Sequence, residues 1–71
     1  MSNRITMHTD QSYEDKDGFW VVAAEEGVSG YRRINVWPTL AEAQQYAAET
    51  NARIGVSDDD RRRILASSMS R

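Results

Sequence analysis

Cysteine is absent from this 71-residue chain, so neither a disulfide framework nor a thiolate metal site can stabilise the fold. Large apolar residues are also scarce, because leucine, isoleucine, valine and phenylalanine together supply only 12 positions. The net charge of -2 is nevertheless too small to keep such a chain unfolded. We therefore expect one domain over residues 1–71 with a thin core, which would gain stability from a partner or a second copy.

Two further absences narrow the functional classes. No apolar run is long enough to cross a bilayer and the N-terminus has no signal-peptide core, which predicts a cytoplasmic protein without membrane contact. Nine basic residues against eleven acidic ones give no broad positive field, so the composition disfavours nucleic acid as a partner. The only histidine, His8, has no cysteine or helically spaced carboxylate pair beside it, so we expect no metal, no cofactor and no enzymatic activity.

The strongest pattern in the chain is a β-hairpin that leads directly into a helix. Phe19–Ala24 and Tyr31–Trp37 are rich in β-branched and aromatic residues, and two glycines mark the turn between them. Alternation along the second strand gives it an aliphatic face, so we expect Ile34 and Val36 to contribute to the core. On the first strand we expect Trp20 to be a core residue.

Two helices are predicted after the hairpin. Thr39, followed three residues later by a glutamate, forms a capping box for a helix over Leu40–Ile54, and Gly55 suits its left-handed end. A second capping box at Ser57 begins a short helix over residues 57–69. Before the hairpin, Arg4–His8 is a candidate edge strand and the rest of residues 1–17 is a polar loop. The fold class is α+β, with a two- or three-stranded antiparallel sheet packed on one main helix.

Both faces of the first hairpin strand are apolar, and one helix can cover only one of them. This leaves the face of Phe19 and Val21 for the C-terminal helix or for a second copy of the chain. We therefore predict a homodimer, with the C-terminal helix packing on its own chain or on its neighbour. The candidate self-association residues are Phe19, Val21, Ile64, Leu65 and Met69.

The second hairpin strand carries the candidate partner-binding residues Tyr31, Arg33, Asn35 and Trp37, which strict alternation places on one face. Tryptophan, tyrosine and arginine dominate protein-binding hot spots, and the same side chains could stack bases or pair with phosphates. A purely structural alternative is that the tryptophan covers the end of the core while the arginine is solvated.

The run from Asp58 to Arg63 consists of three aspartates followed by three arginines. Consecutive residues of a helix point about 100° apart, so the three carboxylates cannot converge on one ion. We interpret the run as a solvated helix start with ion pairs four residues apart, Asp58 with Arg62 and Asp59 with Arg63.

The hairpin followed by the Thr-x-x-Glu-Ala segment at Thr39–Ala43 resembles a pattern common in small uncharacterised bacterial and phage proteins. Over roughly Phe19–Ala48 it also resembles the arm-type DNA-binding domain of tyrosine integrases. That resemblance implies a sheet that enters the major groove, although here only Arg33 lies with Asn35 on the candidate face. We therefore expect a non-enzymatic accessory or regulatory protein of phage or mobile-element origin that binds another protein and self-associates; the alternative is a nucleic-acid-binding module that uses Arg33, Asn35 and Trp37.

Overall fold

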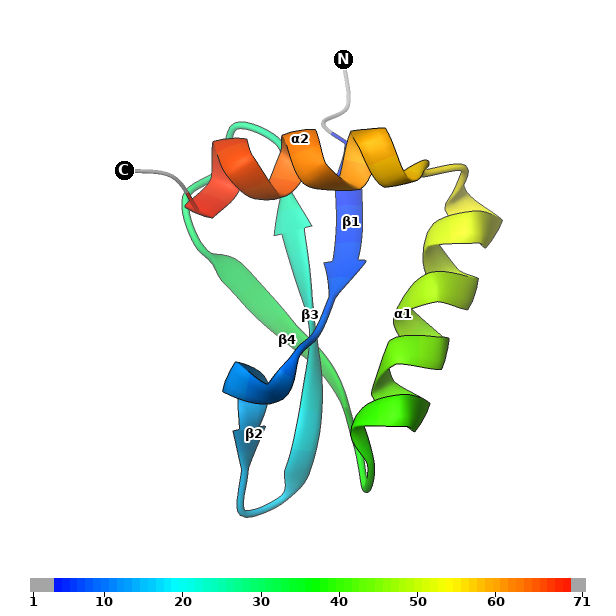
Figure 1. Cartoon of the computed structure of the whole chain (residues 1–71). Coiled ribbons are helices and arrows are strands. Elements are labelled where there is room, and N and C mark those ends of the chain that lie inside the picture. The colour runs from blue at the N-terminus through cyan, green and yellow to red at the C-terminus, as the bar shows by residue number, and fades with distance from the viewer. Residues whose placement is uncertain (1–3, 70–71) are drawn as a thin grey trace.

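The structure is a computed structural model, and it describes residues 4–69 apart from the side chain of Met69. It has the expected α+β class, with an antiparallel sheet and two helices (Figure 1). The elements in chain order are β1 (Ile5–His8), the 3-10 helix η1 (Gln11–Tyr13), β2 (Glu14–Asp15), β3 (Gly18–Glu25), β4 (Tyr31–Trp37), α1 (Leu40–Ile54) and α2 (Asp58–Met69).

The long strand β3 is the centre of the sheet. Along one side it pairs with β4, and along the other it pairs first with β2 at Gly18 and Phe19 and then with β1 at Val22–Glu25. The sheet therefore has four antiparallel strands, and β1 and β2 share one side of β3. The prediction that Thr9–Asp17 is only a loop is wrong. The two elements it contains are three and two residues long, too short for any periodicity to show in the sequence.

Helix α1 packs on the face of β3 that carries Phe19 and Val21, not on the face of Trp20. Val21 is fully buried and forms the core with Ala43 and Ala47 of α1. Small alanine side chains allow the helix to approach the sheet closely. Four larger, partly buried residues surround this cluster: Met7, Phe19, Trp37 and Tyr46.

Helix α2 crosses β1 and β3 near the hairpin turn (Figure 1). Its Ile64 is fully buried, as is Val22 on the face of β3 opposite Val21. Because α1 occupies the Val21 face, α2 is the cover for the opposite one. The C-terminal end of α2 is fixed to the turn by Ser68, whose carbonyl accepts from the Gly30 N–H at 3.0 Å and whose hydroxyl donates to the Gly30 carbonyl at 2.7 Å.

The predicted bounds of α1 are confirmed, and α2 begins one residue later than predicted, at Asp58. The capping box at Ser57 is confirmed; at Thr39 the Glu42 carboxylate instead accepts from the Thr39 hydroxyl at 3.0 Å. The Thr39 hydroxyl accepts from the backbone N–H of Glu42 at 3.2 Å, and Gly55 ends α1 with a left-handed φ of 80°. At the start of α2, the Asp60 N–H donates to the Ser57 hydroxyl at 3.1 Å and the Ser57 N–H donates back to the Asp60 carboxylate at 3.4 Å.

Candidate functional site

A β-bulge separates the four candidate partner-binding residues of β4 into two groups. Asn35 pairs with Val21 and Arg33 pairs with Val22, so Ile34 between them has no partner of its own on β3. Val21 and Val22 point to opposite faces of the sheet, and their partners on β4 must do the same. The expectation that Tyr31, Arg33, Asn35 and Trp37 share one face is therefore wrong.

On the α1 side of the sheet, Trp37 is a packing residue. Its ring lies 5.4 Å from the ring of Tyr46 on α1, and its indole nitrogen is buried without a hydrogen-bond partner among the described residues. Asn35 is on the same side and is exposed. The bulge also leaves Ile34 40% exposed, which contradicts its assignment to the core.

On the other side of the sheet, Arg33 lies over the ring of Trp20, with its guanidinium carbon 4.9 Å from the ring centroid. Trp20 donates from its indole nitrogen to Asp15 at 2.9 Å, and Arg33 is 3.6 Å from the same carboxylate. The backbone N–H of Asp17 also donates to Asp15, and this hydrogen bond is the main cause that lowers the pKa of the Asp15 carboxyl below its usual value. Asp15 is therefore a fixed negative charge beside an exposed arginine.

A row of rings extends from this cluster toward β1. Tyr31 of β4 meets Tyr13 of η1 edge to face at 5.3 Å, and Tyr13 meets His8 of β1 in the same way at 5.6 Å. Burial raises the pKa of the Tyr13 hydroxyl above its usual value. Tyr31 is the most exposed of these rings, at 51%. We call His8, Tyr13, Trp20, Tyr31 and Arg33 together the aromatic patch.

The charged arginine of the aromatic patch, and its histidine, each lie beside a carboxylate. His8 is 3.3 Å from Asp10, and Arg33 is 3.6 Å from Asp15. The sequence pattern identified Tyr31 and Arg33. It missed Tyr13 because η1 was not predicted, and it assigned Trp20 to the core and gave His8 no role. The aromatic residues themselves were visible in the sequence.

Residues near η1 include the three side-chain types of a nucleophilic triad in the wrong order. The Ser12 hydroxyl and backbone N–H both donate to Asp10, and His8 is paired with the same carboxylate. In a working triad the histidine must lie between the acid and the hydroxyl, where it can take the proton. Here the carboxylate lies in the middle, and it acts as the N-cap of η1. Among residues 4–69 no three histidine or acidic side chains gather as a metal-binding group.

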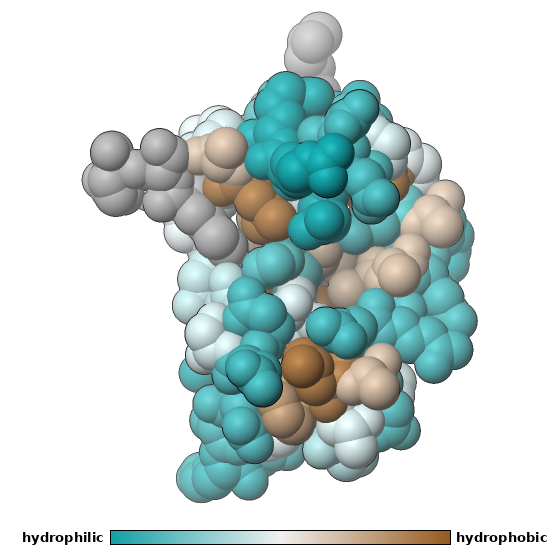
Figure 2. Space-filling view, viewed as in Figure 1, coloured by the Kyte–Doolittle hydropathy of each residue, from teal (hydrophilic) through white to brown (hydrophobic). Residues whose placement is uncertain are grey.

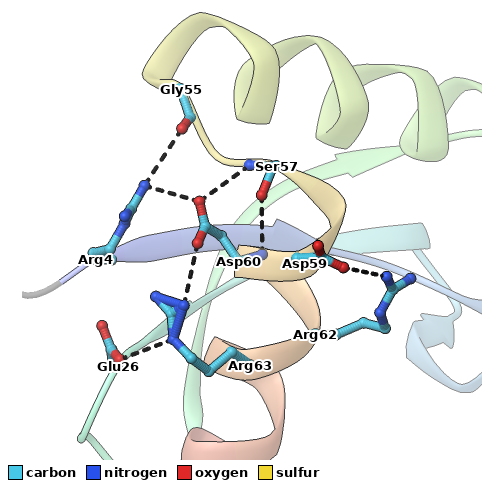
Figure 3. Close-up of polar contacts among 8 residues, drawn as sticks. All are labelled: Arg4, Glu26, Gly55, Ser57, Asp59, Asp60, Arg62 and Arg63. Atoms are coloured by element: carbon cyan, nitrogen blue, oxygen red, sulfur yellow. Dashed lines mark hydrogen bonds and ion pairs between the residues drawn. The ribbon is translucent and has the colours of Figure 1, made fainter.

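The acidic and basic run at the start of α2 forms a structural junction (Figure 3). Its ion pairs are three residues apart, not four: Asp58 with Arg61, Asp59 with Arg62 and Asp60 with Arg63. Asp60 also accepts from Arg4 at 3.0 Å, and Arg63 reaches Glu26 in the hairpin turn at 3.4 Å. The run thus joins the start of β1, the hairpin turn and α2.

A groove of about 580 Å³ lies between β1, α1 and the start of α2. Asn51 and Thr9, which line it, are buried and already bonded within the chain. The Asn51 side chain bonds the backbone of Met7, and the Thr9 hydroxyl donates to the carbonyl of Trp20 at 2.7 Å. These two polar groups are therefore used to hold the fold together.

The structure corrects two of the five candidate self-association residues. Val21 and Ile64 are fully buried within their own chain, so neither can contact a second copy of the folded protein. Phe19 and Leu65 are partly buried, and Met69 has a side chain outside the described set. On the side of the molecule in Figure 2, hydrophobic surface forms small patches separated by hydrophilic residues.

Comparisons of the chain with protein-family models, with curated proteins and with solved structures find no match. Of the two helices within residues 4–69, neither has the length and apolar character needed to span a bilayer.

Proposed function

We propose that this chain is a non-enzymatic accessory or regulatory protein that binds another protein through the aromatic patch and the adjoining strand β4. The observation that supports this most is where apolar side chains are exposed. Four large hydrophobic residues are exposed among those described, and three of them, Val28, Tyr31 and Ile34, lie on the β3–β4 hairpin. Exposed apolar residues are typical of interaction surfaces when they lie close together, and these three belong to one hairpin.

The composition of the surface favours a protein partner over nucleic acid. Tyrosine, tryptophan and arginine are the residues enriched at protein hot spots, and here Tyr31 and Arg33 are the exposed members of a patch supported by Trp20. The neighbouring carboxylate of Asp15 would repel a phosphate backbone. We therefore propose a protein partner, and the experiment below distinguishes it from nucleic acid bound through the sheet face.

The test is capture of partners from host lysate with the tagged full chain, followed by mass spectrometry. The variants Tyr31→Ala and Arg33→Glu should lose the partner, because they remove the exposed ring and reverse the exposed charge. The matched controls are Ile54→Ala and Arg62→Glu, which alter an exposed apolar residue and an exposed arginine away from the patch. Circular dichroism checks that all four variants are folded.

Two outcomes contradict the proposal. If the patch variants capture the same proteins as the wild type, the binding surface lies elsewhere. If capture is abolished by nuclease, and the affinity for DNA falls steeply with salt, the protein binds nucleic acid through phosphate contacts.

A further inference from the structure

The turn between β3 and β4 is held by a helix outside the hairpin. The turn contains Gly27 and Gly30, and glycine is the residue type with the greatest backbone freedom. The C-terminal end of α2 lies beside this turn (Figure 1) and bonds both glycines. The Gly27 N–H donates to the Ser67 hydroxyl at 3.0 Å, and Gly30 is bonded twice by Ser68. Helix α2 therefore orders a turn whose own sequence favours many conformations.

Ser68 makes the anchor that lies closer to the aromatic patch. Its carbonyl accepts from the Gly30 N–H at 3.0 Å, and its hydroxyl donates to the Gly30 carbonyl at 2.7 Å. Ser68 is only 1% exposed, so its hydroxyl needs this partner within the protein. The Gly30 carbonyl belongs to the planar peptide unit that joins Gly30 to Tyr31. The hydroxyl of Ser68 therefore fixes the orientation in which the chain enters Tyr31.

Tyr31 is the patch residue that depends most on this anchor. It is the first residue of β4, and the ends of an element are where pairing opens most easily. Its backbone pairs with Ala24, whereas its ring is 51% exposed and meets the ring of Tyr13 edge to face at 5.3 Å. One edge-to-face contact is weak by itself. The position of the exposed ring therefore depends on the peptide unit that Ser68 holds.

The last turn of α2 is attached by few contacts. Ile64 is fully buried, but of the residues that follow it up to Ser68 only Ser68 is buried and Leu65 partly so. The hydrogen bonds to Gly27 and Gly30 are thus a large part of what holds this turn of the helix. Segments with few buried apolar contacts open locally at a low free energy, without unfolding the rest of the protein.

We propose that Ser68 is a positioning residue for the aromatic patch, and that docking of the α2 end on the hairpin turn regulates partner binding there. With the α2 end docked, Tyr31 is held against Tyr13 and the patch is complete. When the end is released, the turn and the first residue of β4 move, and the exposed ring leaves its neighbour. The coupling is reciprocal, so a partner that holds Tyr31 also holds the end of α2. This inference rests on the proposed function and specifies how the same surface is regulated.

The experiment compares Ser68→Ala with Ser67→Ala in the full chain by NMR. Ser68→Ala removes the hydroxyl bonded to Gly30, and Ser67→Ala is the matched control, because it removes the hydroxyl bonded at the other end of the turn. We expect Ser68→Ala to speed hydrogen exchange at the Gly30 amide about tenfold. It should also weaken the nuclear Overhauser contacts between the rings of Tyr31 and Tyr13, which Ser67→Ala should leave unchanged. Wild-type amide signals along α1 check that both variants are folded.

The reciprocal measurement removes the ring and observes the anchor. Tyr31→Ala should speed exchange at the Gly30 amide at least about twofold, because the turn loses the contact that holds it from the patch. Tyr31→Phe is the control, since it keeps the ring that meets Tyr13, and it should exchange at the wild-type rate. A purely structural role of Ser68 would not make the Gly30 amide respond to the ring of Tyr31.

These measurements need no partner, so they are independent of the proposed function. Wild-type ring contacts in Ser68→Ala, or wild-type exchange at the Gly30 amide in Tyr31→Ala, would show that the two sites are not coupled and would overturn the inference. In the capture experiment, Ser68→Ala should retain at least about threefold less partner than Ser67→Ala, because a smaller fraction of the protein has a complete patch. Equal capture by these two variants would also overturn the inference. The proposed function itself is judged separately, by whether the patch variants lose the partner.

Discussion

Asn51 of α1 hydrogen-bonds both backbone groups of Met7 with its side-chain amide, at 2.8 and 3.0 Å, as a neighbouring strand would. Its carbonyl oxygen also accepts from the Thr6 hydroxyl at 3.3 Å. One side chain therefore closes the β1 edge and attaches the helix to the sheet. Asn51 is buried, and its bonding role was not predicted from the sequence.

Replacing Asn51 with leucine should destabilise the protein by about 2 to 3 kcal/mol, because the Met7 backbone groups and the Thr6 hydroxyl lose their partner in a mostly buried site. Urea denaturation followed by tryptophan fluorescence measures the change. Gln44→Ala, on an exposed position of the same helix, should change stability by less than about 0.5 kcal/mol. Equal stability of the two variants would show that water replaces the side chain at this edge.

Val21→Ala should cost about 2 kcal/mol, because Val21 is fully buried between β3 and α1 and its methyl groups leave a cavity. Ile34→Ala removes more apolar atoms but should cost less than about 1 kcal/mol, since the bulge leaves that side chain 40% exposed. Chemical denaturation of both variants tests the bulge directly. A larger loss for Ile34→Ala would mean that strict alternation holds along β4.

Gly18→Ala should prevent stable folding. Gly18 has a φ of 131°, a conformation that favours glycine, and an added Cβ would overlap the carbonyl oxygen of Trp37 on the neighbouring strand. The matched change Gly27→Ala meets nothing within 4 Å and should cost only about 1 kcal/mol for its positive φ of 80°. Thermal denaturation distinguishes the two. A stable Gly18→Ala protein would contradict the close approach of β3 and β4.

Asp60→Asn should lower stability near neutral pH and have less effect in acid. The backbone N–H of Ser57 is the main cause that holds the pKa of the Asp60 carboxyl below its ordinary value of 3.8. Because the folded state binds this proton less readily than the unfolded state, the carboxylate stabilises the fold above pH 3.8. That contribution is lost as the pH falls through the lowered value.

Urea denaturation of wild type and Asp60→Asn from pH 7 to pH 3 measures this dependence. Asp59→Asn is the control, because Asp59 pairs only with the exposed Arg62 among the described contacts. A constant difference between wild type and Asp60→Asn across the whole range would show that ionisation of the Asp60 carboxyl does not contribute to stability.

Local signals in the sequence determined most of the secondary structure of this protein and its fold class. The bounds of α1 and the long hairpin strands follow from capping boxes, a left-handed glycine and β-branched runs, because each of these acts over a few neighbouring residues. The α+β class follows in turn, since a hairpin and an amphipathic helix must bury their apolar sides against each other.

Only the tertiary structure decided which side chains meet. The bulge at Ile34 adds one residue to β4, and this turns Arg33 toward Trp20 while Trp37 stays with Tyr46 under α1. A period of two can predict faces only while pairing is continuous, so one unpaired residue reverses every assignment beyond it. Asn51 bonds Met7 and Asp60 bonds Arg4, and each pair is more than 40 positions apart along the chain. Patterns among neighbouring residues cannot predict contacts between such distant positions.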